Sequence, residues 1–270
     1  MGVGLSVLNK VRGGSLYVIK ERQLPHLMFF IPSQRPPLLK VCNFIHLLPL
    51  PPNVRVHSAI NPLLVCISRL ILGFHRIPSH PSINLPILLG KGSDGNFPIW
   101  SLIIYSPYLY FVRAFSFIRG FTSGEPPYSK IDEGLYVGGW PYAPDKLPPG
   151  NPAIVDCTCE LPRKREVTGS AYLCVPTWDT RSPDPGEIER AVKWACGKRA
   201  QGVPVFVHFA YGHGRSVAVM CALLVALGLA EDWKTAEKII KEKRPYIRMN
   251  SLHRKALEEW SKDRLSTPKR

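Results

Sequence analysis

The stretch VPVFVHFAYGHGRSVAVMCALLVALG, residues 203–228, decides the fold. Its first six residues are mostly β-branched or aromatic, which predicts a short buried strand. The segment FAYGHGR then carries two glycines, and the apolar run that follows predicts a helix over 216–228. A strand, a glycine-containing loop and a helix in this order can present backbone N–H groups and a helix N-terminus to a phosphate group.

Further strands are predicted before this stretch. KIDEGLYVGG, residues 130–139, has an alternating pattern that predicts a strand ending in two glycines. AIVDC (153–157) and AYLCVP (171–176) are short apolar runs that are typical of buried strands. Together with VPVFVH they predict a sheet of four or five strands.

Helices are predicted between and after these strands. Asp184 and Glu187 have the spacing of a capping box with proline in the first turn, and apolar residues follow at helical intervals. Two more helices are predicted over 232–243 and 251–262, the second with Asn250 as its N-cap. Strands interleaved with helices indicate an α/β domain with a central, mostly parallel sheet flanked by helices.

The segment from His208 to Ser216 reads HFAYGHGRS. It resembles the signature loop of protein tyrosine and dual-specificity phosphatases, in which His-Cys is followed by two residues, Gly, two residues, Arg, and Ser or Thr. Every fixed position matches except the cysteine, which is Phe209 here. RPYIRMN (244–250) and LYVGG (135–139) resemble further segments of that family, so the resemblance covers a domain over about 129–262.

The resemblance implies a role for each position of the loop. Ser216 would hydrogen-bond the leaving thiolate, and His208 would orient the loop. The nucleophile position is Phe209, which cannot accept a phosphoryl group. Backbone amides and a planar guanidinium would hold the phosphate dianion. The residues implied in phosphate binding are Ala210, Tyr211, Gly212, His213, Gly214 and Arg215.

A general acid is expected about thirty residues before the nucleophile position, again because of the resemblance. Asp179 lies 30 positions before Phe209 and follows a predicted strand. Asp184 is the alternative acid, although its capping-box spacing already gives it a structural role. Trp178 would either shape the substrate cleft or pack in the core.

The substituted nucleophile leaves three functions open. The first is a catalytically impaired pseudophosphatase of the dual-specificity and tyrosine phosphatase family. The second is an active phosphomonoester phosphatase acting on phosphorylated proteins, whose cysteine is lost only in this allele or record, because Cys and Phe codons differ by one base. The third is a membrane-associated binding protein.

Neither a metal nor a cofactor is expected. His213 invites assignment as a metal ligand with His208 and Cys221, but the three have no recognisable ligand spacing. The seven cysteines are odd in number, which favours a reducing cytoplasmic compartment over a disulfide scaffold. The expected partner is a phosphorylated protein or another phosphomonoester, and no nucleic acid is expected.

The first half of the chain differs in composition. Residues 1–120 hold 12 Lys or Arg and 2 acidic residues, whereas residues 121–270 hold 23 and 18. Prolines interrupt the apolar runs of residues 1–96, so a Pro-rich, basic extension that is disordered or poorly packed is expected there. An organellar transit peptide and translation through an unspliced segment are the alternatives. Residues 263–270 are expected to form a basic tail.

Residues 97–121 form a hydrophobic segment between the extension and the domain. Its first 16 residues carry no charge, and Arg113 and Arg119 follow. With Pro107 in the middle the segment is short for a bilayer span. An interfacial or re-entrant membrane contact and a helix packed on the domain are both open interpretations.

Overall fold

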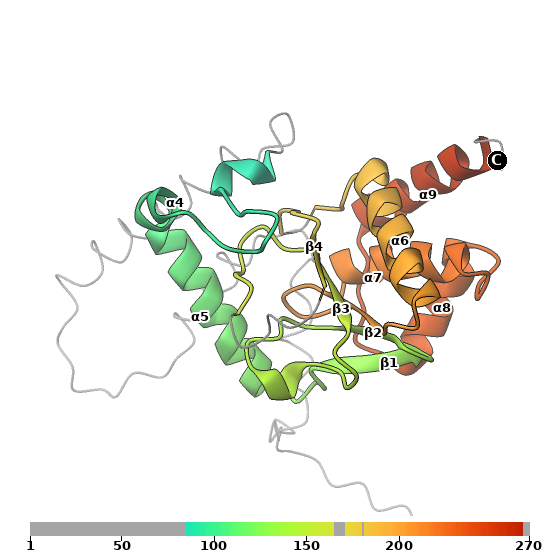
Figure 1. Cartoon of the computed structure of the whole chain (residues 1–270), viewed down its shortest axis with the longest axis horizontal. Helices are drawn as coiled ribbons and strands as arrows, with labels where there is room; N and C mark the ends of the chain where they lie inside the picture. The colour runs from blue at the N-terminus through green and yellow to red at the C-terminus, as the bar shows by residue number, and fades with distance from the viewer. Residues whose placement is uncertain (1–84, 165–170, 180, 267–270) are drawn as a thin grey trace, which may run out of the picture. The chain divides into compact units, whose positions relative to one another are not determined.

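The computed structural model describes residues 85–164, 171–179 and 181–266 (Figure 1). Its strands are β1 (Tyr128–Asp132), β2 (Leu135–Gly138), β3 (Ala153–Asp156), β4 (Tyr172–Cys174) and β5 (Val205–His208). Its α-helices are α4 (Ile99–Ile104), α5 (Ser106–Thr122), α6 (Pro185–Ala200), α7 (Arg215–Ala226), α8 (Trp233–Lys243) and α9 (Ser251–Ser266). Two short 3-10 helices, η2 (Pro86–Leu89) and η3 (Pro144–Lys146), complete the described elements.

The strands form one five-stranded sheet in the order β1-β2-β5-β3-β4. β1 pairs antiparallel with β2, and the other neighbours pair in parallel. The predicted α/β class, a mostly parallel sheet flanked by helices, is therefore confirmed. β5 lies at the centre of the sheet, so the loop that follows it emerges among the carboxyl ends of β2 and β3, where ligands bind in open α/β sheets.

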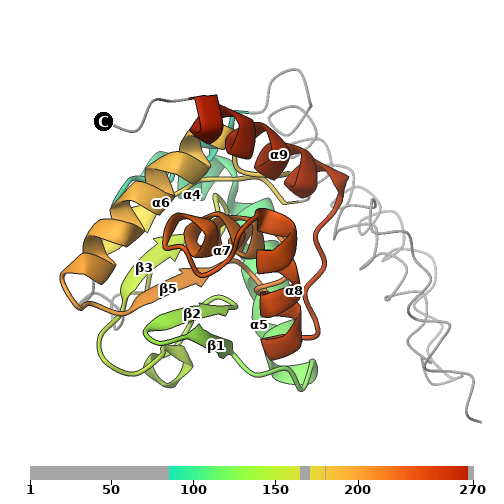
Figure 2. The same cartoon turned by 90° about the vertical axis from the view of Figure 1, so that its right-hand side faces the viewer.

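Helices α6 to α9 cover one face of the sheet (Figure 2). Alternate side chains of a strand point to opposite faces. Val205 and Val207 of β5 accordingly belong to the main buried cluster, together with residues of α6 and α7. Ten consecutive residues of α7, from Arg215 to Leu224, are buried. The helix after the loop is thus fixed by packing along its length.

Helices α4 and α5 lie on the other side of the sheet from α6 to α9 (Figures 1 and 2). Tyr108, Leu109 and Val112 of α5 are buried in a second cluster with Trp140 and Trp178. Residues 97–121 therefore form helices that pack on the domain. Within the described part of the chain, no helix is long and apolar enough to cross a membrane.

The sequence analysis places residues 85–96 in a poorly packed extension, and here the structure differs. Leu89 is 1% exposed and packs in the second cluster. The ammonium of Lys91 donates to Asp156 Oδ2 at 2.7 Å and to the carbonyl of Thr158 at 2.8 Å. Because a buried carboxylate needs a cation or hydrogen-bond donors, Asp156 holds this segment against the end of β3.

The remaining domain boundaries are predictions that fall partly outside the described residues. Residues 1–84 of the expected extension and residues 267–270 of the expected tail lie outside them. Residues 263–266, also assigned to the tail, continue α9 instead. The predicted start of the domain near residue 129 leaves out α4, α5 and the buried Lys91, which lie earlier in the chain.

Lys91→Met is expected to destabilise the protein by about 3–5 kcal/mol, because it leaves the carboxylate of Asp156 buried without its cation. Both side chains of this pair are 1% exposed. Urea unfolding would measure the loss. The matched control is Lys130→Met, because Lys130 forms its ion pair with Glu133 at the surface, and it should leave the midpoint unchanged. Equal midpoints for the two variants would contradict the buried role of Lys91.

Candidate functional site

The loop Phe209–Gly214, called the phosphate loop below, joins β5 to α7. Gly212 has a φ of +74°, and a Cβ there would lie within 2.6 Å of the backbone of Gly138. A Cβ on Gly214 would lie 2.8 Å from the ring of His253. Both positions need glycine because the loop curls tightly against neighbouring elements. The loop therefore has the compact shape that the sequence predicts.

Arg244 holds the outer side of the phosphate loop. This side chain is 1% exposed, and its guanidinium donates to the carbonyls of Gly212 at 3.1 Å and Tyr211 at 2.9 Å. It also donates to the carbonyl of Pro126 at 3.1 Å, just before β1. The Arg-Pro segment noted in the sequence is thus a structural clamp on the loop.

Arg215, the expected phosphate ligand, is 1% exposed and already has acceptors. Its Nη2 lies 2.7 Å from Glu160 Oε1, and its Nη1 lies 3.2 Å from Glu160 Oε2. Nη1 also donates to the carbonyls of Cys157 and Thr177. Burial lowers the pKa of Arg215, but the Glu160 carboxylate more than compensates and raises it above its ordinary value. The guanidinium is therefore a charged partner of Glu160.

Glu160 is a site residue that the sequence analysis missed. It is 1% exposed and follows β3 in the apolar run CTCELP. A lone carboxylate in an apolar run at the carboxyl end of a strand is a signal for a buried ion pair, since isolated buried charges are costly. Its partner could not be read from the sequence, because Arg215 lies 55 residues further along the chain.

The ring of Phe209 lies on the guanidinium of Arg215, with Cζ 3.8 Å from the ring centroid. Phe209 is 6% exposed, and its ring centroid is 5.9 Å from that of Tyr211. An arginine over an aromatic face is a favourable cation–π contact. An apolar ring thus covers the donor group that the resemblance assigns to phosphate.

Asp179 reaches the same guanidinium, with Oδ1 3.4 Å from Nη2 of Arg215 and its side chain 24% exposed. The structure therefore brings together Asp179, Arg215 and Phe209. The alternative acid, Asp184, lies at the N-cap of α6 and is exposed. Its side chain makes no capping hydrogen bond, so the capping-box expectation is wrong at that position.

Several buried polar groups next to the loop have no hydrogen-bond partner within the described residues. They include the hydroxyl of Ser216, which is 0% exposed, Nδ1 of His208 and Nε of Arg215. Burial lowers the pKa of His208 to about 4, so its ring is neutral at pH 7. A hydroxyl buried without a partner costs roughly 1–3 kcal/mol. The resemblance assigns Ser216 a thiolate partner, and a phenyl ring offers no such acceptor.

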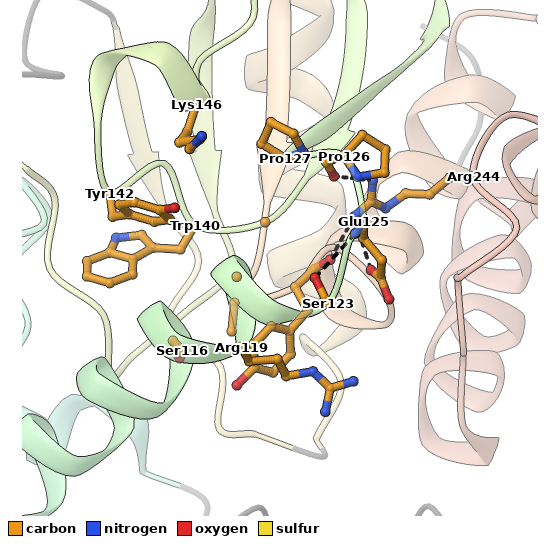
Figure 3. Close-up of a pocket in the computed structure, with 14 residues that line it drawn as sticks. Ser116, Arg119, Ser123, Glu125, Pro126, Pro127, Trp140, Tyr142, Lys146 and Arg244 are labelled. Carbon is orange, nitrogen blue, oxygen red and sulfur yellow. Dashed lines mark hydrogen bonds and ion pairs between the residues drawn. The ribbon is translucent and has the colours of Figure 1, made fainter. Parts of the chain in front are cut away.

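A cavity of about 100 Å³ lies beside the phosphate loop (Figure 3). Trp140, Tyr142 and Lys146 line one side of it, and Arg119 enters from α5. Its lining includes one carboxylate, Glu125, which lies 2.5 Å from the ring of His213. His213 is thus held at the rim of the loop by an ionisable partner.

No family model matches the chain, and no curated protein matches it. Solved phosphatase structures are similar to it. Human DUSP28 has 21% sequence identity and a TM-score of 0.44, with 52% of this chain and 97% of that chain covered. Tk-PTP in its active form has 23% identity and a TM-score of 0.46, with 51% and 97% covered. Human tyrosine phosphatase-like serine/threonine/tyrosine-interacting protein has 20% identity and a TM-score of 0.44, with 52% and 98% covered.

The described domain has the mostly parallel sheet that the resemblance to dual-specificity phosphatases predicts. A tight loop between β5 and α7 and an arginine at the start of α7 accompany this sheet. The likeness to the solved structures is one of fold and covers about half of the chain. The roles of the loop residues and of Asp179 stay predictions.

Proposed function

We propose that this chain is a catalytically impaired phosphatase-like protein, a pseudophosphatase. The observation that carries the proposal is the ring of Phe209 at the nucleophile position, 3.8 Å from the guanidinium carbon of Arg215. The ring supplies no nucleophile and places an apolar surface where a phosphate dianion needs donors. Catalysis and phosphate binding are both expected to suffer.

Neighbouring side chains do not replace the missing thiolate. The hydroxyl of Ser216 has no hydrogen-bond partner within the described residues, so no base is placed to activate it. Burial raises the pKa of the Cys157 and Cys221 thiols well above their ordinary value, so both stay protonated at pH 7. The site therefore keeps Arg215 and the expected general acid, Asp179, but has no side chain among the described residues that can act as the nucleophile.

The proposed partner is a phosphorylated protein or another phosphomonoester, and the proposed location is the cytoplasm. The shape of the loop supports this ligand class, because it curls tightly and leads into the N-terminus of a fully packed helix. The competing proposal is an active phosphatase whose cysteine is lost only in this allele or record. The sequence of the gene from independent sources decides between them.

The natural chain is expected to hydrolyse para-nitrophenyl phosphate no faster than buffer, and Phe209→Cys is expected to restore turnover. The gain should be roughly 10⁴-fold, the size of effect that nucleophile deletion has in other enzymes. Phe209→Cys combined with Asp179→Ala should lose most of the restored rate, because the leaving oxygen is then not protonated. Steady-state kinetics of the three proteins measures this.

Phe209→Ser is the matched control, because it removes the ring without supplying a thiolate, and it should stay inactive. Natural-chain turnover equal to that of Phe209→Cys would refute the pseudophosphatase proposal. A folded Phe209→Cys protein without turnover would show that Phe209 is not the only defect.

We also propose a contact between residues 97–121 and a membrane surface. The supporting observation is the outer face of α4 and α5, where Ile99, Ile103, Ile118 and Phe121 are each at least 59% exposed. The segment also contains two arginines, Arg113 and Arg119, and no acidic residue, although Arg119 stacks on Tyr211. An apolar face with basic residues is typical of helices that lie in the interface of an anionic membrane.

Co-sedimentation of the full chain with phosphatidylserine-rich vesicles is expected, and Ile103→Glu with Phe121→Glu should reduce it. The matched control is Leu229→Glu, because Leu229 is an exposed apolar residue outside this segment. Failure of the natural chain to sediment, or an equal loss in the control, would refute the membrane contact.

A further inference from the structure

Helix α5 contributes a side chain to the charged cluster around Arg215. Tyr108 is 3% exposed, and its ring centroid lies 6.4 Å from that of Trp178, the residue before Asp179. Burial raises the pKa of Tyr108 well above its ordinary value, and the charge of Glu160 adds to the rise. The phenol of α5 thus lies within electrostatic range of the group that would bind phosphate.

The second half of α5 contacts the phosphate loop itself. Phe115 meets the ring of Tyr211 edge-on at a centroid distance of 6.4 Å. The guanidinium carbon of Arg119 lies 4.8 Å from the centroid of the same ring. Since Tyr211 packs on Phe209, α5 is coupled through one aromatic ring to the nucleophile position.

Three residues of the site beneath these contacts are buried. Ser216 is 0% exposed, Arg215 is 1% exposed and Phe209 is 6% exposed. A ligand with a phosphate group has to reach the guanidinium of Arg215, which requires an element above it to move. α5 lies against two neighbours of this guanidinium, because Tyr108 and Leu109 are buried in one cluster with Trp178 and Phe115 contacts Tyr211.

We propose that α5 is an autoinhibitory cap on the phosphate loop, and that a phosphorylated ligand enters only when α5 swings away. The junction after α5 suits such a movement. Gly124 is exposed and has a φ of +65°, and a Cβ on it would meet no atom of the described residues within 4 Å, so packing does not restrain it. The next residues are fixed, because Arg244 holds Pro126. Because Lys91 anchors the segment before α4, a hinge at 123–124 together with a bend at Tyr105, between α4 and α5, would release α5 and leave the loop intact.

The cap and the rest of the domain also differ in how fully they are packed. α5 buries one face only, and Tyr110 and Phe117 on its other face are 62% and 47% exposed. α7, by contrast, is buried over ten consecutive residues. Elements with fewer buried contacts open at lower free energy than the core, so α5 can open while α7 stays in place.

The proposal depends on the proposed function only in taking the loop as a phosphate-binding loop, and its test needs no turnover. The thiol introduced by Phe209→Cys reports access to the loop. In the full chain its alkylation by iodoacetamide, resolved by peptide mass spectrometry, should be slow. Adding Tyr108→Ala and Leu109→Ala should speed it by roughly tenfold or more, because each change removes buried contacts of α5.

Two internal controls keep this test specific. Tyr110→Ala changes an exposed tyrosine of the same helix and should leave the alkylation rate unchanged. Cys221 lies fully buried in α7, so its alkylation reports opening of the whole domain and should stay slow in every variant.

Fast alkylation of the introduced thiol in the protein with an unaltered α5 would overturn the proposal. An alkylation rate that does not change when Tyr108→Ala and Leu109→Ala are added would also overturn it. A parallel rise at Cys221 would also overturn it, because α5 would then support the whole domain and would not gate the loop. The cap also slows the entry of para-nitrophenyl phosphate, so the account of Phe209 is judged on Phe209→Cys combined with Tyr108→Ala and Leu109→Ala. A folded triple variant that passes the alkylation test but lacks turnover would refute the account of Phe209 and leave the cap in place.

Discussion

The buried guanidinium of Arg215 is the group on which the rest of the site depends. A charge that is 1% exposed needs a partner, and Glu160 supplies it with two contacts at 2.7 and 3.2 Å. Removing one member of such a pair leaves an uncompensated buried charge, which costs several kcal/mol. The ring of Phe209 covers the same guanidinium. The terminal nitrogens of Arg215 and the face of its guanidinium are therefore already in contact with groups of the protein.

The surrounding scaffold fits a phosphate-binding loop, although its nucleophile is absent. Gly212 allows the loop to approach the backbone of Gly138, and Arg244 holds the loop carbonyls from outside. Packing of α7 fixes the position of Arg215. These contacts that shape the loop do not use the side chain of residue 209, so they are compatible with a phenyl ring at that position.

Much of the fold was predictable because its signals are local. Residues 203–228 contain a strand, a tight loop and a helix in sequence, and Asp179 was found by its spacing from Phe209. The contacts that were missed join residues far apart. Lys91 meets Asp156 across 65 residues and Arg215 meets Glu160 across 55, so neither pair leaves a periodic pattern in the sequence. Prolines predicted a poorly packed segment over residues 85–96, and the distant partner of Lys91 left no local signal against that prediction.

The most direct test of the central claim compares phosphate binding in two proteins whose phosphate loops are equally accessible. Tyr108→Ala and Leu109→Ala would be placed in two proteins, one with the natural Phe209 and one with Phe209→Ser, and inorganic phosphate would be titrated into each by calorimetry. Serine leaves the amides and Arg215 free of the ring without supplying a nucleophile. The account predicts saturable binding to the Phe209→Ser protein and much weaker binding to the protein that keeps Phe209. Equal affinity in the two proteins would contradict it.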